Sequence, residues 1–174
     1  MPAKQGDNRD KVKALCVLSL LAAVCMIVGY LESLIDLSFI VPGIKIGLAN
    51  SVACLLIFSS DIKGAYAVNI TRILLTALLF GSAVSLAFSL AGGIISLTVM
   101  VLLKRCKWFS VIGVSAAGGA VHNAAQCAVG VILTGRGVIY YLPLLIAVGV
   151  VCGALIGFLS MLLLKRTRRV RFNV

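Results

Sequence analysis

The chain has 174 residues, of which 61% are hydrophobic and only 12% are charged, and its mean hydropathy is +1.15. So little polar surface cannot cover a globule in water, and disorder requires low hydrophobicity, so the composition excludes a soluble enzyme and a disordered chain. An integral membrane protein remains, and its net charge of +11 marks either a nucleic-acid surface or the topology of the chain across a bilayer.

Six apolar segments are long enough to cross a bilayer, which takes about 20 residues of helix. In chain order they are residues 13–31, 44–60, 64–81, 83–103, 109–133 and 140–164. We therefore expect an all-α integral membrane protein whose single domain, residues 13–164, is a bundle of six transmembrane helices. An N-terminal tail, residues 1–12, and a basic C-terminal tail, residues 165–174, flank this domain.

The basic residues separate by side of the membrane when they are counted loop by loop. Of the 16 Lys and Arg residues, thirteen fall in the two tails and the even-numbered loops, two fall in the other loops, and Arg72 lies inside a span. The richer side is cytoplasmic by the positive-inside rule, which places both termini in the cytoplasm. The charge is therefore a topology signal, and we expect membrane lipid rather than nucleic acid as its neighbour.

Polar residues inside the spans are the candidates for function, because membrane depth makes them costly. Arg72 lies near the middle of the third span, with Asn69 one turn earlier on the same face. A charge there costs at least about 2.5–3.5 kcal/mol, so Arg72 should face a partner or a cavity. Two interpretations stay open. Glu32 and Asp36 of the first outer loop pair with Arg72, or they gate that loop while Arg72 meets a ligand.

The fifth and second spans carry the other candidates for a ligand site. His122, Asn123 and Gln126 lie near the middle of the fifth span, and Lys45 and Asn50 belong to the start of the second. His122 has a structural alternative, which is a hydrogen bond to a neighbouring helix. Together with the third span, these side chains could converge into one polar cavity. Its cations would meet negative charge and its amides would fix orientation, which suits a small anionic or carbonyl-rich ligand.

A stripe of small residues on the sixth span predicts close helix packing. Gly149, Gly153 and Gly157 form a GxxxGxxxG pattern that lets a neighbouring backbone approach closely. We expect packing within the bundle, and a docking face for another membrane protein is the alternative.

The residues that known membrane enzymes require are missing from the sequence. A prenyl-transferring synthase needs clustered aspartates such as DDxxD to hold magnesium ions, and the four Asp residues of this chain are not adjacent. There is no Walker A sequence, and no span contains a carboxylate for proton coupling. We therefore expect no enzymatic activity, no metal ion and no cofactor, and any transport would be powered by separate subunits.

Four blocks of the sequence carry a family resemblance. They are residues 42–50 (PGIKIGLAN), 72–82 (RILLTALLFGS), 89–93 (SLAGG) and 119–126 (GAVHNAAQ). These blocks resemble the bacterial Gx transporters, a family often labelled heptaprenyl diphosphate synthase component I. The resemblance covers nearly the whole chain. That family is similar to the substrate-binding S components of energy-coupling-factor transporters. The resemblance implies six helices, an outward-facing pocket and a separate power unit on the cytoplasmic side.

The resemblance also implies a function. By analogy with S components, the chain would bind a vitamin-like, isoprenoid or quinone-type precursor in the bacterial inner membrane, while a separate ATPase and transmembrane module or other membrane proteins supply energy. S components dock through an Ala-x-x-x-Ala face on the first helix, which Ala14, Leu18 and Ala22 match in part. The alternative is a non-catalytic membrane accessory of prenyl diphosphate or quinone synthesis, or of flavin- and quinone-linked electron transfer.

Overall fold

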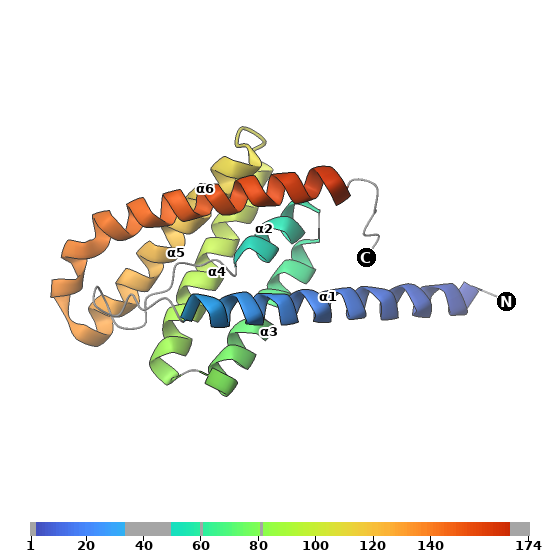
Figure 1. Ribbon diagram of the computed structural model, residues 1–174, viewed down its shortest axis with the longest axis horizontal. Helices are drawn as coiled ribbons and strands as arrows, with labels where there is room; N and C mark the ends of the chain where they lie inside the picture. The colour runs from blue at the N-terminus through green and yellow to red at the C-terminus, as the bar shows by residue number, and fades with distance from the viewer. Residues whose placement is uncertain (1–2, 34–49, 60, 81, 168–174) are drawn as a thin grey trace.

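The computed structural model of the chain describes residues 3–33, 50–59, 61–80 and 82–167, and every regular element in these ranges is helical. The elements are α1 (Ala3–Ser33), α2 (Asn50–Phe58), α3 (Ile62–Phe80), α4 (Ala83–Arg105), α5 (Val111–Thr134), the 3-10 helix η1 (Arg136–Tyr141) and α6 (Leu142–Thr167). Figure 1 shows the helices packed side by side in a bundle. The predicted all-α class is confirmed.

Five of the described helical segments are long and apolar enough to cross a membrane. They are Val12–Leu31, Ile62–Leu79, Ala83–Arg105, Val111–Thr134 and Arg136–Lys165. These segments correspond to the first, third, fourth, fifth and sixth predicted spans. The second predicted span, 44–60, is represented by α2, and its residues 44–49 and 60 lie outside the described part of the chain. The protein is therefore a multi-pass membrane protein.

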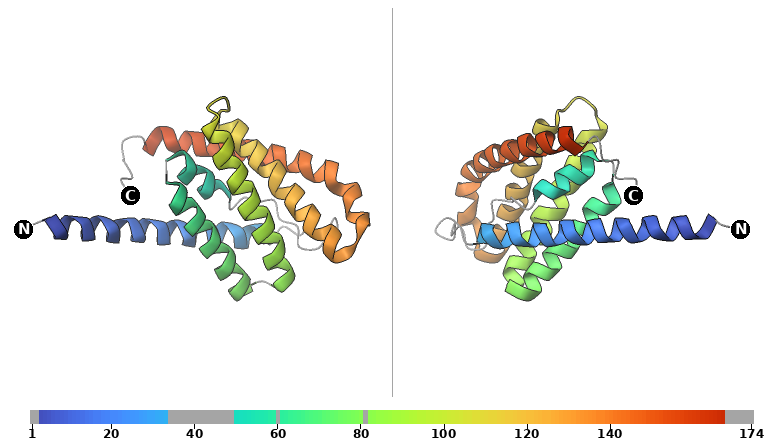
Figure 2. Two further views of the ribbon diagram at one scale, coloured as in Figure 1. Left: turned by 180° about the vertical axis from the view of Figure 1, so that it is seen from behind. Right: turned by 45° about the vertical axis from the view of Figure 1, so that its right-hand side comes forward.

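The first helix is longer than its predicted span. α1 begins at Ala3, so the predicted N-terminal tail is helical from that residue onward. In Figure 1 this part of α1 extends past the other helices. The start of α1 and the end of α6 lie toward the same end of the bundle (Figures 1 and 2).

The closest helix pair is α5 and α6, which touch through their backbones. Gly149 and Gly119 face each other so closely that a Cβ on Gly149 would lie 2.8 Å from the Gly119 carbonyl carbon. A Cβ on Gly153 would lie 2.9 Å from the Ala116 Cα, and one on Gly157 would lie 2.8 Å from the Ile112 Cα. The glycine stripe therefore packs against α5 within the bundle.

A single carboxylate begins α3 after the short turn that follows α2. Oδ1 of Asp61 accepts a hydrogen bond from the Gly64 backbone N–H at 2.7 Å, and the Asp61 carbonyl accepts one from Ala65 at 3.0 Å. This is the geometry of a helix N-cap, which satisfies backbone donors that the first turn leaves open. The cap explains how α2 and α3 are joined by so few residues.

We expect Asp61→Ala to destabilise the protein by about 1 kcal/mol, because the Gly64 N–H loses its acceptor. Asp61→Asn keeps a side-chain oxygen and should remain close to the wild type. The measurement is the unfolding midpoint in detergent, followed by circular dichroism. Equal losses in both variants would show that the charge of Asp61, and not its capping oxygen, matters.

The C-terminal end of α2 is held by a lysine from α4. Lys104 donates from Nζ to the Ile57 carbonyl, and its ammonium lies 5.7 Å from the centre of the Phe58 ring. The last carbonyls of a helix lack partners within it, so a cation at this position stabilises the end of α2. Lys104, which the sequence marks as a topology signal, therefore also fastens α2 to α4.

Candidate ligand-binding site

Most of the predicted site residues that the structure describes are buried. The buried polar side chains among them are Asn50, Asn69, Arg72, His122, Asn123 and Gln126. Because no water solvates the interior of a membrane-spanning bundle, such groups must find partners in the protein or in a ligand. Their hydrogen-bond partners therefore separate structural roles from ligand-binding roles.

The first group, which we call the His122 cluster, links α2 to α5. Nδ2 of Asn50 lies 3.1 Å from Nδ1 of His122, and Nε2 of Gln126 lies 3.0 Å from its Nε2. A neutral imidazole donates from one nitrogen and accepts at the other, so at least one of the two amides presents its oxygen to the ring. On α4, a Cβ at Gly92 would lie 2.8 Å from Cε1 of the ring, so the ring occupies space that glycine leaves open.

The second group, the Arg72 cluster, lies on one face of α3 and consists of Asn69, Arg72 and Thr76. Nη2 of Arg72 donates to Oδ1 of Asn69 at 2.8 Å. This bond turns the Asn69 amide so that its Nδ2 approaches α4, where a Cβ on Gly93 would lie 3.1 Å away. Nδ2 of Asn69 is buried and has no hydrogen-bond partner in the described part of the chain.

Thr76 is the member of the Arg72 cluster that sequence reasoning missed. It follows Arg72 by four residues and Asn69 by seven, so all three share one face of the helix. Its Oγ1 is buried and lacks a hydrogen-bond partner among the described residues. Its position four residues after Arg72 could have identified Thr76 from the sequence.

The two clusters meet at consecutive glycines of α4. Gly92 contacts the His122 cluster and Gly93 contacts the Arg72 cluster. Successive helix residues point about 100° apart, so the clusters lie on neighbouring sides of α4 at the same level. The structure thus brings candidates from three predicted spans together around this glycine pair. That they share a single cavity stays a prediction.

Asn123 is directed away from both clusters. Its Nδ2 donates to the Leu145 carbonyl of α6 at 2.8 Å, and a Cβ on Gly149 would lie 3.0 Å from the same nitrogen. Asn123 therefore belongs to the α5–α6 contact, although it is adjacent to His122 in the sequence. Of the remaining predicted site residues, Lys45 and Asp36 lie outside the described residues, as does the side chain of Glu32.

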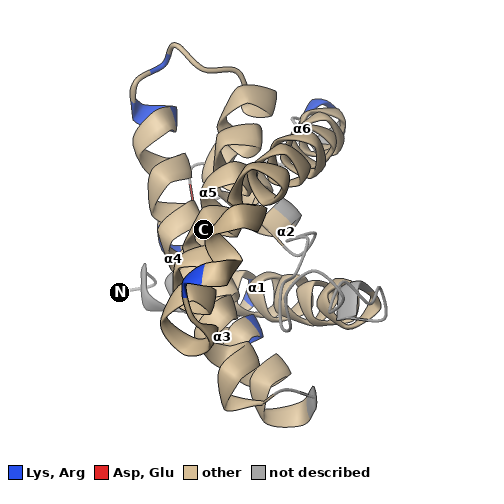
Figure 3. Ribbon diagram, turned by 90° about the vertical axis from the view of Figure 1, so that its left-hand side faces the viewer, with Lys and Arg blue, Asp and Glu red and all other residues tan. Residues whose placement is uncertain are grey.

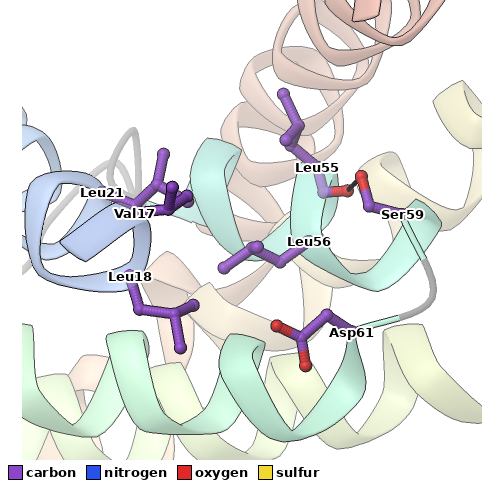
Figure 4. Close-up of a pocket in the computed structure, with 7 residues that line it drawn as sticks. All are labelled: Val17, Leu18, Leu21, Leu55, Leu56, Ser59 and Asp61. Carbon is purple, nitrogen blue, oxygen red and sulfur yellow. Dashed lines mark hydrogen bonds between the residues drawn. The ribbon is translucent and has the colours of Figure 1, made fainter. Parts of the chain in front are cut away.

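Two residues of the partial Ala-x-x-x-Ala match on α1, Leu18 and Ala22, face the bundle. Ala22 is buried in the core, and Leu18 packs against that core. Leu18 also lines an apolar cavity of about 40 Å³ between α1 and α2, and Asp61 lines it too (Figure 4). Leu18 and Ala22 are therefore occupied by contacts within the chain, and the exposed apolar residues of α1 are a different set. That set includes Leu15, Leu20, Val24, Ile27 and Leu31.

Few charged residues lie on the described helices, and the described residues form no group that could hold a metal ion. Figure 3 shows that most of the helical surface carries neither basic nor acidic residues. Within the described ranges, no three His, Cys, Asp or Glu side chains gather where they could hold a metal ion. Three basic residues, Lys104, Arg105 and Lys107, lie together at the end of α4 and the turn after it.

Comparison with known proteins points to a family. The family model described as heptaprenyl diphosphate synthase component I matches residues 21–163, which include both clusters and the glycines that contact them. No curated protein and no solved structure matches the chain.

Proposed function

The chain belongs to the heptaprenyl diphosphate synthase component I family, and we propose that it is a non-catalytic, ligand-binding subunit of a membrane transporter. In this proposal it resembles an S component, lies in the bacterial inner membrane with both termini in the cytoplasm, and depends on separate subunits for energy. Its ligand is a small anionic or carbonyl-rich molecule of the vitamin-like, isoprenoid or quinone-precursor type. The His122 and Arg72 clusters hold it, with Lys45 as a further cation and with Glu32 and Asp36 as gate.

One observation carries this proposal, which is the donor-rich face of α3 inside the membrane-spanning bundle. Oδ1 of the Asn69 amide accepts a hydrogen bond from Arg72. The buried NH2 group of the same amide has no acceptor among the described residues. A buried polar group without a partner costs about 1–3 kcal/mol. A ligand group that accepts from this Nδ2 would satisfy the amide, and this supports a ligand site beside Arg72.

The proposed orientation is supported by charge and by the arrangement of the ends. The uneven distribution of basic residues favours cytoplasmic tails. The start of α1 and the end of α6 at one end of the bundle agree with that placement (Figure 1).

A second candidate function follows from the family description, which names a component of a prenyl diphosphate synthase. In that role the chain would be a membrane accessory of prenyl diphosphate or quinone synthesis, or of flavin- and quinone-linked electron transfer, beside a catalytic partner. The test is elongation of prenyl diphosphates by membranes that contain the catalytic partner with and without this chain. Identical products in both membranes would reject this candidate.

The transporter-subunit proposal is tested by native mass spectrometry of the purified protein. We expect the wild type to carry a small molecule and Arg72→Ala to lose it, because the site then lacks its buried cation. Arg136→Ala is the matched control, since Arg136 is exposed at the start of η1 and should leave retention unchanged. If Arg72→Ala retains the molecule as the wild type does, the site is wrongly assigned. If no preparation carries one, ligand binding is rejected.

A further inference from the structure

The connection between α4 and α5 gathers basic and aromatic side chains at one end of two membrane-spanning helices. We call residues 105–109 the α4–α5 turn, and their sequence is RCKWF. We propose that this turn binds the anionic headgroup of a membrane phospholipid. The turn is separate from the Arg72 and His122 clusters, so its lipid and the ligand of those clusters are tested independently.

The depth of the turn follows from the helices on either side of it. The apolar segments Ala83–Arg105 and Val111–Thr134 are each long enough to cross a bilayer, and residues 106–110 connect them. A connection this short lies where the two spans leave the hydrocarbon. Figure 3 shows the turn projecting from the bundle with basic residues on it. Its side chains therefore lie at the level of the phospholipid headgroups.

Two cations of this region are available to a headgroup. Lys104 is already engaged, since it donates to the Ile57 carbonyl and lies over the Phe58 ring. Arg105 and Lys107 are exposed, and neither forms an ion pair with a described residue. Arginine and lysine both donate charge-assisted hydrogen bonds to phosphate oxygens. The turn can therefore hold one anionic headgroup between two side chains.

Lys107 has a backbone conformation that suits glycine better than lysine. Its φ is 57°, which is the one positive φ of a non-glycine residue in the described part of the chain. Its N–H bonds the Lys104 carbonyl at 3.3 Å, so it occupies the position after a helix end where glycine is common. Left-handed backbone is unfavourable for a residue with a Cβ, and such residues gather at functional sites. Lysine at this position supplies a cation that glycine lacks.

The two aromatic residues of the turn favour a lipid over a protein partner. Trp108 is 93% exposed and Phe109 is 49% exposed, so both rings extend beyond the packing of the bundle. Indole has an apolar body and an N–H donor, and it is favoured where hydrocarbon meets headgroups. An acidic protein segment would neutralise the cations without giving the rings an apolar environment. A phospholipid provides a phosphate and acyl chains together, and so matches both kinds of side chain.

Trp108 makes lipid contact directly measurable, because it is the only tryptophan of the sequence. The full chain is reconstituted in vesicles that mix phosphatidylcholine with phosphatidylglycerol, and one of the two lipids is brominated. Bromine quenches indole fluorescence at contact, so the two labelling schemes report which lipid lies beside the turn. Each Lys or Arg near an anionic membrane contributes about fivefold in affinity. We therefore expect the wild type to prefer phosphatidylglycerol at least about fivefold at low salt, and less at high salt.

Two variants remove one cation each. Lys107→Gly introduces the residue that the left-handed position favours, so the unfolding midpoint should stay level or rise while the lipid preference falls about fivefold. Arg105→Gln keeps a side chain that suits a helix end, and it should lower the preference by a similar factor. Lys63→Gln is the matched control, since Lys63 is an exposed lysine of α3 outside the turn and its loss should leave the preference unchanged.

Each outcome decides for or against a lipid site at the turn. A preference for phosphatidylglycerol that Lys107→Gly and Arg105→Gln reduce, and that Lys63→Gln retains, supports the site. An equal loss in Lys63→Gln overturns it, because the lipids then respond to net charge and not to the turn. Equal quenching by the two brominated lipids in the wild type also overturns it. Fluorescence that neither brominated lipid quenches overturns it as well, and leaves the turn in water for an acidic protein partner.

Discussion

Gly153→Ala should separate α5 from α6 and lower stability by about 3 kcal/mol, at the upper end of the range for overpacking. The added Cβ would overlap the Ser115 carbonyl and lie 2.9 Å from the Ala116 Cα. Both contacts are backbone atoms of a helix, which cannot rotate aside as a side chain does. The glycine stripe continues on either side of this position, so a shift of α6 that relieves one contact tightens another.

The measurement is the unfolding midpoint in detergent, together with the fraction of protein that elutes as a single species. Gly137→Ala is the matched control, because a Cβ at Gly137 would meet nothing within 4 Å. A midpoint for Gly153→Ala equal to that of Gly137→Ala would show that α5 and α6 are not in backbone contact in the membrane protein. The effect should also appear in bilayers, since the contact is made by packing and not by exclusion of water.

The helices could be predicted from the sequence because the signal for a membrane span is local. A run of apolar residues needs no knowledge of its neighbours to be identified as a span, and α4 begins at Ala83, where the prediction placed it. Helix ends were harder, because they depend on side chains near the membrane surface. The start of α1 at Ala3 and the N-cap of Asp61 are of this kind.

The candidate site was only partly predictable, because its hydrogen bonds cross between helices. The sequence places His122 and Asn123 in adjacent positions, and helical geometry turns them about 100° apart. Which of the two contacts α2 and which contacts α6 depends on how the helices cross. In the structure His122 contacts Asn50 of α2, and Asn123 donates to the Leu145 carbonyl of α6. Lys104 and the Ile57 carbonyl are likewise 47 residues apart in the chain.

His122→Leu should destabilise the protein by about 3 kcal/mol, because it leaves two buried amides without their shared partner. Asn50 and Gln126 both contact the ring nitrogens, and Gln126 has no exposed surface. Each amide would lose a hydrogen bond, and no water is at hand to replace the imidazole. His122→Gln, which keeps polar atoms in the same place, should recover part of the loss.

The sharper measurement is a double-mutant cycle between positions 50 and 122. If the His122 cluster fastens α2 to α5, Asn50→Ala and His122→Leu should be non-additive by about 0.6–1.7 kcal/mol, the range for hydrogen bonds between membrane helices. Circular dichroism is the suitable readout, because Trp108, the single tryptophan, is 93% exposed and reports poorly on the interior. Additive losses would mean that the contact between Asn50 and His122 contributes nothing. The His122 cluster would then serve the ligand alone, without joining α2 to α5.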